Sequence, residues 1–564
     1  MEGRFVRVLV PLRLDWIPVY RSEFPLRRGQ SVRVIFAGRE YTGVVWESDA
    51  APDISEDRIL PVTAEIPELP DLSETEMKFW EFLSEYYLCS PCEVYRAALP
   101  AIKSGQTEIR RHKKLEARMK AKRETELLRL RDRLTSAVER IGQRLKAVDA
   151  KLAAAHHSET VMNRLEEQKG SLERQLAEKR RELSGLPPAA DAVAEKKPDS
   201  INRECTPRHR ALKPQVIAGT GRGPHYLEAV LKALDCGGQV LILTPESAFC
   251  DRLEAYLKPK LGDRLLTVGT ASARGRTAVA LQGGENIAVV STKTGIFLPF
   301  SRLALVIIDN EQDSLYKQND SAPRYNGRDA AIKLAELHSA DVILGSPCPS
   351  LETIHNCITG KFDIIRIGGS SAIPVIVDVG EEKKKNGMSG YFSRRLAAAV
   401  MKCGGPVMLI RGWEKPDELR EQTALLFPGR DIRIATLTEL KRQGCGDPAM
   451  IAVLQADALV SKDDFRSDER ALQLVATLCG MAPEVWIQTC VRERFDGSKT
   501  AESLLAERRE FGYPPYSRLV DIRREGSGET VERHFLRRGP DLAAQKRELL
   551  STMPEGCYPD VDPA

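Results

Sequence analysis

Three apolar stretches of the chain end in residues that could bind a nucleotide. The run Leu303–Asp309 closes on an aspartate, Val216–Ala218 runs into the glycine-rich turn Gly219–His225, and Asp341–Leu344 runs into Gly345–Ser350. An apolar, β-branched run of this kind is typical of a buried parallel strand, and ligands bind beyond the carboxyl ends of such strands. Together the three stretches predict a nucleotide-dependent α/β lobe.

The glycine-rich turn lacks two groups that a phosphate loop needs. Such a loop needs glycines for close backbone approach, a lysine for the phosphate charge and a Ser or Thr hydroxyl for Mg²⁺. Pro224 and His225 stand where the lysine and the hydroxyl are required. Because proline is tolerated in the first turn of a helix, we expect the fold to survive without the phosphate clamp. The candidate nucleotide-binding residues are Gly219, Thr220, Gly221, Gly223, Pro224 and His225.

In this order, these stretches resemble the PriA family of bacterial primosomal replication-restart helicases (primosomal protein N′). The family's phosphate loop, GVTGSGKT, is similar to Gly219–His225, and its IIVDEEHDSSYKQ is similar to Ile307–Gln318. Its PRYHARDLA resembles Pro323–Ala331, and its GSATPSLET resembles Gly345–Thr353. The resemblance implies two RecA-like lobes of a superfamily 2 helicase, DNA as partner, and ATP with Mg²⁺ as candidate cofactors.

The resemblance also implies where catalytic groups would lie. ATP hydrolysis in such motors needs an acid for Mg²⁺, a carboxylate base and arginine fingers. Asp309 matches the Mg²⁺ acid, Asn310 stands at the base, and Gln312 replaces the histidine that couples the site to DNA. The family's QVSGRAGR places Met481 and Glu484 at its two arginines. We therefore expect no DNA-stimulated ATP hydrolysis.

Candidate DNA contacts come from two regions. The first 75 residues alternate apolar and polar positions, which predicts a small β-domain; they resemble the family domain that binds a DNA 3′ end. The alternatives are a solvated strand face for the first region and local pairs of Arg324 and Arg328 with Asp320 and Asp329 for the motor lobe. The candidates are Arg33 and Arg39 in the β-domain, and Lys293, Lys317, Arg324 and Arg328 in the motor lobe.

Residues 106–186 are helical in pattern and strongly basic. They hold 21 Lys/Arg and 13 Asp/Glu, against a net charge of +4 for the whole chain. Two apolar seams flank a break at His156–Ser158, which predicts an antiparallel coiled-coil hairpin. Its basic side could touch DNA or a partner helix, and the alternative is a solvated coil. The seam residues are Leu134, Val138, Ile141, Leu145, Val148 and Leu152, then Leu165, Leu172, Leu176 and Leu183.

The full length of 564 residues has room for several domains. The predicted order begins with a β-rich domain, 1–75, a helical connector, 76–105, and the basic hairpin, 106–186. A linker, 187–210, leads to helicase lobe 1, 211–366. A reduced lobe 2, 367–490, and a truncated C-terminal domain, 491–564, complete the chain.

Cysteine usage argues against zinc. Of twelve cysteines, Cys89 and Cys92 form the one close pair, whereas a structural zinc site needs four ligands. The family's zinc module would lie between Trp413 and Leu425, where there is no cysteine.

No apolar run is long enough for a membrane span, and the N-terminus lacks the layout of a signal peptide. We expect a cytoplasmic protein with no zinc and no membrane partner.

Three hypotheses follow for function. The first is a PriA-like protein of replication restart that binds forked or single-stranded DNA, has lost motor activity, and works beside other primosome or single-strand-binding proteins. The second is an active ATP-dependent 3′-5′ DNA helicase of the primosome. The third is a coiled-coil interaction scaffold without DNA binding. An ATPase assay separates the second from the others, and salt-dependent DNA binding separates the first from the third.

Overall fold

The computed structural model describes residues 4–52, 54–67, 69–153, 159–186, 212–368, 372–443, 446–460 and 464–563. Within it, the chain divides into two compact units, one of Met1–Gln106 with Glu204–Ala564 and one of Thr107–Arg203. The predicted hairpin turn at His156–Ser158 and the predicted linker, 187–210, lie outside the described residues.

The chain begins with a five-stranded antiparallel sheet in the order β2-β1-β4-β3-β5. Alternate residues face the core, so Val8, Val32, Val34 and Val45 are fully buried while Arg33 is exposed. This confirms the predicted small β-domain. The strands are β1 (Arg4–Leu9), β2 (Val19–Ser22), β3 (Ser31–Phe36), β4 (Arg39–Ser48) and β5 (Ala64–Glu65).

A seven-stranded parallel sheet forms lobe 1, in the order β12-β6-β11-β10-β7-β9-β8. Its strands are β6 (Gln215–Ala218), β7 (Gln239–Leu243), β8 (Leu265–Thr267), β9 (Ala288–Ser291), β10 (Leu303–Asp309), β11 (Asp341–Ser346) and β12 (Asp363–Arg366). Its helices are α4 (Gly223–Asp235), α5 (Ser247–Leu261), α6 (Ala271–Gln282), α7 (Gly327–His338) and α8 (Leu351–Ile358).

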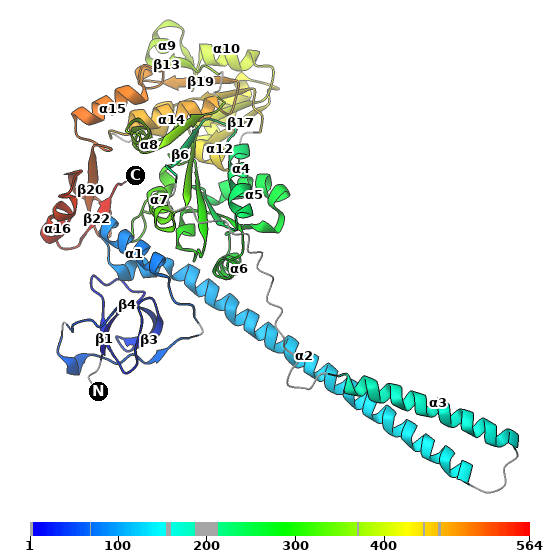
Figure 1. The fold of residues 1–564 in the computed structure, drawn as a ribbon. Coiled ribbons are helices and arrows are strands. Elements are labelled where there is room, and N and C mark those ends of the chain that lie inside the picture. Colours follow the sequence, from blue (N-terminus) through cyan, green and yellow to red (C-terminus); the bar gives the residue numbers. More distant parts are fainter. Residues whose placement is uncertain are drawn as a thin grey trace. The chain divides into compact units, whose positions relative to one another are not determined.

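Helices cover both faces of this sheet, as Figure 1 shows in green. Ile307 packs with residues of α4 and α5, while its neighbours Val306 and Ile308 pack with residues of α7. A strand buried on both faces reads as a continuous apolar run, which is why the sequence pattern located β10. Because β6, β11 and β10 are neighbours, the three polar strand ends lie side by side.

A second parallel sheet forms lobe 2, in the order β13-β19-β18-β16-β17. Two parallel sheets confirm the predicted α/β class of RecA-like lobes. The strands are β13 (Val375–Asp378), β16 (Val407–Arg411), β17 (Ile432–Thr436), β18 (Met450–Val453) and β19 (Glu484–Thr489), with a small hairpin of β14 (Met388–Ser389) and β15 (Phe392–Ser393). The helices are α9 (Val379–Lys385), α10 (Arg394–Lys402), α11 (Pro416–Leu426), α12 (Leu437–Gln443), α13 (Ala456–Val460) and α14 (Ser467–Cys479).

The C-terminal segment adds a three-stranded antiparallel sheet, β21-β20-β22. Val520, Ile522 and Val561 share a hydrophobic core with lobe 1. The elements are α15 (Ala501–Glu510), β20 (Ser517–Arg524), β21 (Thr530–Arg537), α16 (Leu542–Thr552) and β22 (Cys557–Val561).

Two helices follow the N-terminal sheet, α1 (Glu74–Tyr87) and α2 (Pro91–Ala153). Helix α2 continues through Pro100 and through the predicted boundary at residue 106. The connector and the first arm of the hairpin are therefore one helix, and the predicted division between them corresponds to no break in secondary structure.

Within the second unit, α3 (Glu159–Ser184) runs back along α2. Lys169 pairs with Asp149 at 2.8 Å, and Leu134, Val148 and Leu172 of the predicted seams are buried. These contacts confirm a helical hairpin, and the supercoil of a coiled coil stays a prediction. None of the helices in the described ranges has the length and apolar content that a membrane span requires.

Candidate nucleotide site

The glycine-rich turn connects β6 to α4 and lies against the end of β11. Gly219 follows β6, and its N–H donates to the carbonyl of Ser346 at 2.8 Å. Gly219 has a φ of +131°, and a Cβ there would lie 1.8 Å from the carbonyl oxygen of Ile367. Glycine is therefore required by both backbone conformation and space. Helix α4 then begins at Gly223, with Pro224 in its first turn and His225 exposed to solvent.

Arg222 fills the space between this loop and the end of β10. Its Nη2 lies 2.8 Å from Oδ1 of Asp309 and 3.0 Å from Oδ1 of Asn310, and its Nη1 donates to the carbonyl of Gly219 at 2.6 Å. Sequence reasoning missed this residue, although the family loop GVTGSGKT has a small serine at its position. A large cation in a glycine-rich turn was the available signal.

A buried tyrosine completes the contacts of Asp309. The hydroxyl of Tyr226 donates to Oδ1 of Asp309 at 2.7 Å, and Nε of Arg222 donates to that hydroxyl at 3.0 Å. A Cβ at Gly345 would lie 1.5 Å from the Tyr226 hydroxyl, so glycine is needed there for this approach. Burial opposes the charge of Arg222, but Asp309 raises the pKa of the guanidinium above its ordinary value. Arg222 and Asp309 therefore form a half-buried, charged pair.

The residues after Asp309 have separate partners. Asn310 has a φ of +51°, a conformation that asparagine tolerates, and its Nδ2 donates to Oδ2 of Asp309 at 3.0 Å. Gln312 accepts a hydrogen bond from Oγ of Ser346 at 2.6 Å. Glu311, which the sequence analysis did not single out, is buried and paired with Arg328 at 3.0 Å. Because an amide has no basic oxygen at neutral pH, Asn310 cannot serve as a carboxylate base.

Gly480 of lobe 2 packs against Thr220 of the glycine-rich turn. A Cβ at Gly480 would lie 2.6 Å from Cγ2 of Thr220, so the two lobes are in close contact there. Met481 is packed against the core of lobe 2, and Glu484 accepts a hydrogen bond from the indole N–H of Trp486 at 2.7 Å. Neither side chain can supply the positive charge of an arginine finger.

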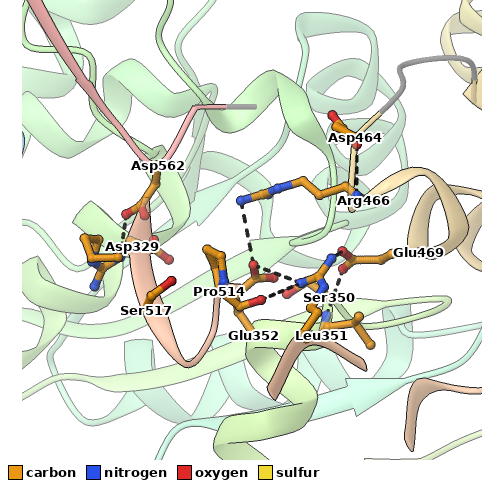
Figure 2. Close-up of polar contacts among 12 residues, drawn as sticks. Asp329, Ser350, Leu351, Glu352, Asp464, Arg466, Glu469, Pro514, Ser517 and Asp562 are labelled. Carbon is orange, nitrogen blue, oxygen red and sulfur yellow. Dashed lines mark hydrogen bonds and ion pairs between the residues drawn. The ribbon is translucent and has the colours of Figure 1, made fainter. Parts of the chain in front are cut away.

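A buried cluster of charges joins lobe 1, lobe 2 and α15. Glu469 of α14 accepts a hydrogen bond from the backbone N–H of Leu351 at 2.8 Å and is paired with Arg508. Arg508 also lies 3.5 Å from Glu352, and Arg466 lies 3.8 Å from the same carboxylate. Figure 2 shows Arg466 reaching toward Glu352, with Glu469 beside Leu351.

The two carboxylates of this cluster differ in pKa. Burial opposes the charge of Glu352, but Arg466, Arg508 and Arg328 together lower its pKa. Burial and the charge of Glu352 raise the pKa of Glu469. The sequence analysis missed this cluster because its members come from separate elements.

Two of the predicted DNA contacts have structural partners in place of solvent. Lys317 is 2% exposed, pairs with Asp560 at 2.8 Å and donates to the carbonyl of Val561 at 2.6 Å. Arg328 pairs with Glu311 and with Asp329. The second pair is the local pair that the sequence analysis gave as the alternative to a DNA contact. A phosphate contact needs an accessible charge, so we assign both residues to the structural interior of the protein.

Of the other four candidates, Arg33 and Arg39 are exposed, whereas Lys293 and Arg324 are half-buried. Arg33 and Arg39 are exposed on the N-terminal sheet, with Arg33 lying 3.4 Å from Glu40. Lys293 donates to the carbonyls of Leu315 and Lys317, and burial lowers its pKa. The Arg324 guanidinium lies 3.5 Å from the ring centre of Tyr558. Arg33 and Arg39 are therefore the two exposed residues among the six predicted DNA contacts.

No metal centre is evident from side-chain positions. In the part of the chain that the structure describes, no group of three or more His, Cys, Asp or Glu residues is placed to hold a metal ion. Cys89 and Cys92 are free thiols, and burial raises the pKa of both. The expected absence of zinc stays a prediction.

Parts of the amino-acid sequence are similar to known replication restart proteins. Residues 7–100 match the family model of the PriA 3′DNA-binding domain. The replication restart protein PriA of Haemophilus influenzae is 33% identical over 201 residues, which cover 34% of this chain and 27% of that protein. PriA of Chlamydia pneumoniae is 25% identical over 369 residues, which cover 62% of this chain and 48% of that protein. The matches thus span less than half the length of these relatives.

Solved structures give weaker matches. RecG bound to a three-way DNA junction has a TM-score of 0.35 and 14% identity, covering 61% of this chain and 48% of that one. A DEAD box protein from Methanococcus jannaschii has a TM-score of 0.28 and 13% identity, covering 54% and 87%. The sequence comparisons confirm the resemblance that the motifs indicated, and the chain is therefore related to the replication restart protein PriA.

Proposed function

We propose that this chain is a DNA-binding protein of replication restart, with forked or single-stranded DNA as its partner and without ATP-driven unwinding. The observation that carries the proposal is the Arg222–Asp309 pair. In a working site, a carboxylate at the end of this strand would hold Mg²⁺ against the nucleotide phosphates. Here the same carboxylate neutralises a guanidinium of the protein itself.

The rest of the site supports the loss of hydrolysis. Binding of Mg²⁺ and ATP would have to separate a half-buried ion pair, with side-chain exposures of 12% for Arg222 and 15% for Asp309. Breaking such a pair leaves an uncompensated charge and costs about 3 kcal/mol or more. Pro224 stands where a lysine would stabilise the phosphate charge, and Asn310 has no carboxylate to act as the base. The residues present do not fit Mg²⁺–ATP.

The contacts between lobes support a fixed arrangement. Motor activity requires the lobes to open and close around the nucleotide. Glu469 and Arg508 instead join α8, α14 and α15 through buried, charge-assisted bonds, which are about twice as strong as neutral ones. Lys441 adds a further link between lobes through Asp313, at 2.9 Å.

DNA binding rests on the N-terminal sheet. Residues 7–100 match a model that describes a 3′DNA-binding domain. Arg33 lies within β3 and Arg39 begins β4, and among the described residues no carboxylate lies within 4 Å of Arg39. An exposed, unpaired arginine can contact a phosphate or a terminal hydroxyl without first losing a partner.

The experiment measures fork binding by fluorescence anisotropy, with and without a non-hydrolysable ATP analogue. At one fixed Mg²⁺ concentration, we expect wild-type protein to bind a fork with a free 3′ end with the same Kd whether or not the analogue is present. Arg39→Gln should weaken fork binding severalfold, whereas Arg264→Gln, at an exposed arginine of lobe 1, should not. Absence of fork binding at low salt would contradict the proposal, and so would a Kd that depends on the nucleotide.

A further inference from the structure

A strongly basic surface outside the nucleotide site lies on α2. Between Arg110 and Lys122, seven residues are Lys or Arg and one, Glu116, is acidic. All seven are exposed, and of these seven, among the described residues, Arg111 alone has a carboxylate within 4 Å, Glu108 at 3.7 Å. We call this stretch the basic segment; its cations are Arg110, Arg111, Lys113, Lys114, Arg118, Lys120 and Lys122.

Helix α3 leaves the basic segment uncovered. The antiparallel register set by Asp149 and Lys169 brings the end of α3, Ser184, level with Leu134. Leu134 is buried, whereas residues 113–122 are exposed at every position, and Figure 1 shows α3 beside only the C-terminal half of α2. The basic segment is thus a single helix with solvent around it within this unit.

We propose that the basic segment binds the backbone of double-stranded DNA. At 1.5 Å per residue it is roughly 18 Å long, and the major groove of B-DNA admits one α-helix. Its cations spread over more than half of the helix circumference, so they can reach phosphates on both sides of a groove, as continuous basic helices do. The net positive charge, with a single carboxylate pair among the described residues at Arg111, favours binding by counterion release.

The composition of the segment argues for duplex DNA over other acidic partners. Single-strand binding depends on aromatic rings that stack on bases, and residues 107–133 contain no Phe, Tyr or Trp. Binding to a lipid surface needs a broad apolar face, whereas Leu115 and Met119 are the only large apolar residues here. Binding of duplex DNA by the basic segment would be separate from the proposed binding of a 3′ end by the N-terminal domain, because a duplex contact needs no free end.

The test uses the full chain and a closed dumbbell duplex, which has no 3′ end for the N-terminal domain. One variant changes Arg110, Lys113, Lys114, Arg118 and Lys122 to Gln; the matched control changes Lys383, Lys384, Lys385, Arg395 and Lys402 of lobe 2 to Gln. Both remove five exposed positive charges. Glutamine keeps a helix propensity close to that of Lys and Arg, and circular dichroism checks that α2 persists.

If three of the five side chains contact phosphates, the negative slope of log K against log salt becomes shallower by about 2.7 in the first variant. The ratio of wild-type to variant affinity then shrinks about 40-fold between 50 and 200 mM salt. The lobe 2 control should keep the wild-type slope, and exchanging Lys for Arg and Arg for Lys at the five positions should restore it.

The outcomes separate this inference from the proposed function. An unchanged slope in the first variant, an equal loss in the lobe 2 control, or no dumbbell binding by wild-type protein would overturn the duplex surface. Each of these results can occur while the fork with a free 3′ end is still bound. Loss of fork binding in wild-type protein would instead contradict the proposed function.

Discussion

The guanidinium of Arg222 lies 2.8 Å from the carboxylate of Asp309, at the point where a phosphate loop and a metal-binding acid would otherwise share a nucleotide. The loop that carries Arg222 keeps its glycines, and the strand that carries Asp309 keeps its place in the sheet. The strand and the glycine-rich turn of the candidate site are therefore both present, and the carboxylate of Asp309 is paired with a cation of the protein itself.

Substituting two residues of the glycine-rich turn should increase the affinity for nucleotide. Arg222→Ser frees the carboxylate of Asp309, and Pro224→Lys supplies the missing phosphate charge. We expect the double variant to bind a fluorescent ATP analogue with Mg²⁺ at least about tenfold more tightly than wild type, since a charge-assisted bond contributes about 1.5–3 kcal/mol. Arg264→Ser, at an exposed pair in the same lobe, is the control. An affinity of the double variant equal to that of wild type would show that the Arg222–Asp309 pair is not what closes the site.

Arg508 of the buried charge cluster should contribute strongly to stability, whereas the adjacent Arg509 should not. Arg508→Met leaves the buried carboxylates of Glu352 and Glu469 without their shared partner, and this should lower the free energy of unfolding by about 3–5 kcal/mol. Arg509→Met changes an exposed side chain on the same helix and should cost less than about 1 kcal/mol. Urea denaturation of both variants provides the comparison. Equal midpoints would mean that the cluster does not hold the lobes together.

The strands could be predicted from the sequence because their signal is local. Leu303–Asp309 is apolar on both faces, and its neighbours end in glycine, so the pattern located all three strand ends. Arg222 could not be assigned in this way, because its partner lies 87 residues further along the chain. The same holds for Glu469 and Arg508, 39 residues apart in the sequence. Long-range polar contacts depend on the tertiary arrangement, which periodicity does not encode.

Lys317 should behave as a structural residue and not as a DNA contact. Its pair with Asp560 has side-chain exposures of 1% and 3%, so Lys317→Met should lower the free energy of unfolding by about 3 kcal/mol. Arg33→Met, at an exposed pair, should cost about 0–1 kcal/mol. Thermal unfolding distinguishes the two. A stable Lys317→Met protein with weakened DNA binding would return Lys317 to the DNA surface.

The half-buried side chain of His338 should make stability depend on pH. Burial lowers the pKa of His338 from 6.5 to about 4, so the unfolded chain binds the proton more readily than the folded chain does. The stability contribution is complete above pH 6.5 and is lost as the pH falls toward 4. Between pH 7 and 5.5 this amounts to about 1 kcal/mol. Urea midpoints of wild type and His338→Gln should therefore converge with falling pH, and parallel curves would rule out His338 as the source.

The most direct test of the account is steady-state ATP hydrolysis by the purified chain, with single-stranded and forked DNA present. Asp309→Ala supplies the background rate, because it removes the acid at the end of β10 that would hold Mg²⁺. We predict that the wild-type rate equals that background, with and without DNA. DNA-stimulated turnover that Asp309→Ala abolishes would contradict the account and would favour an active helicase.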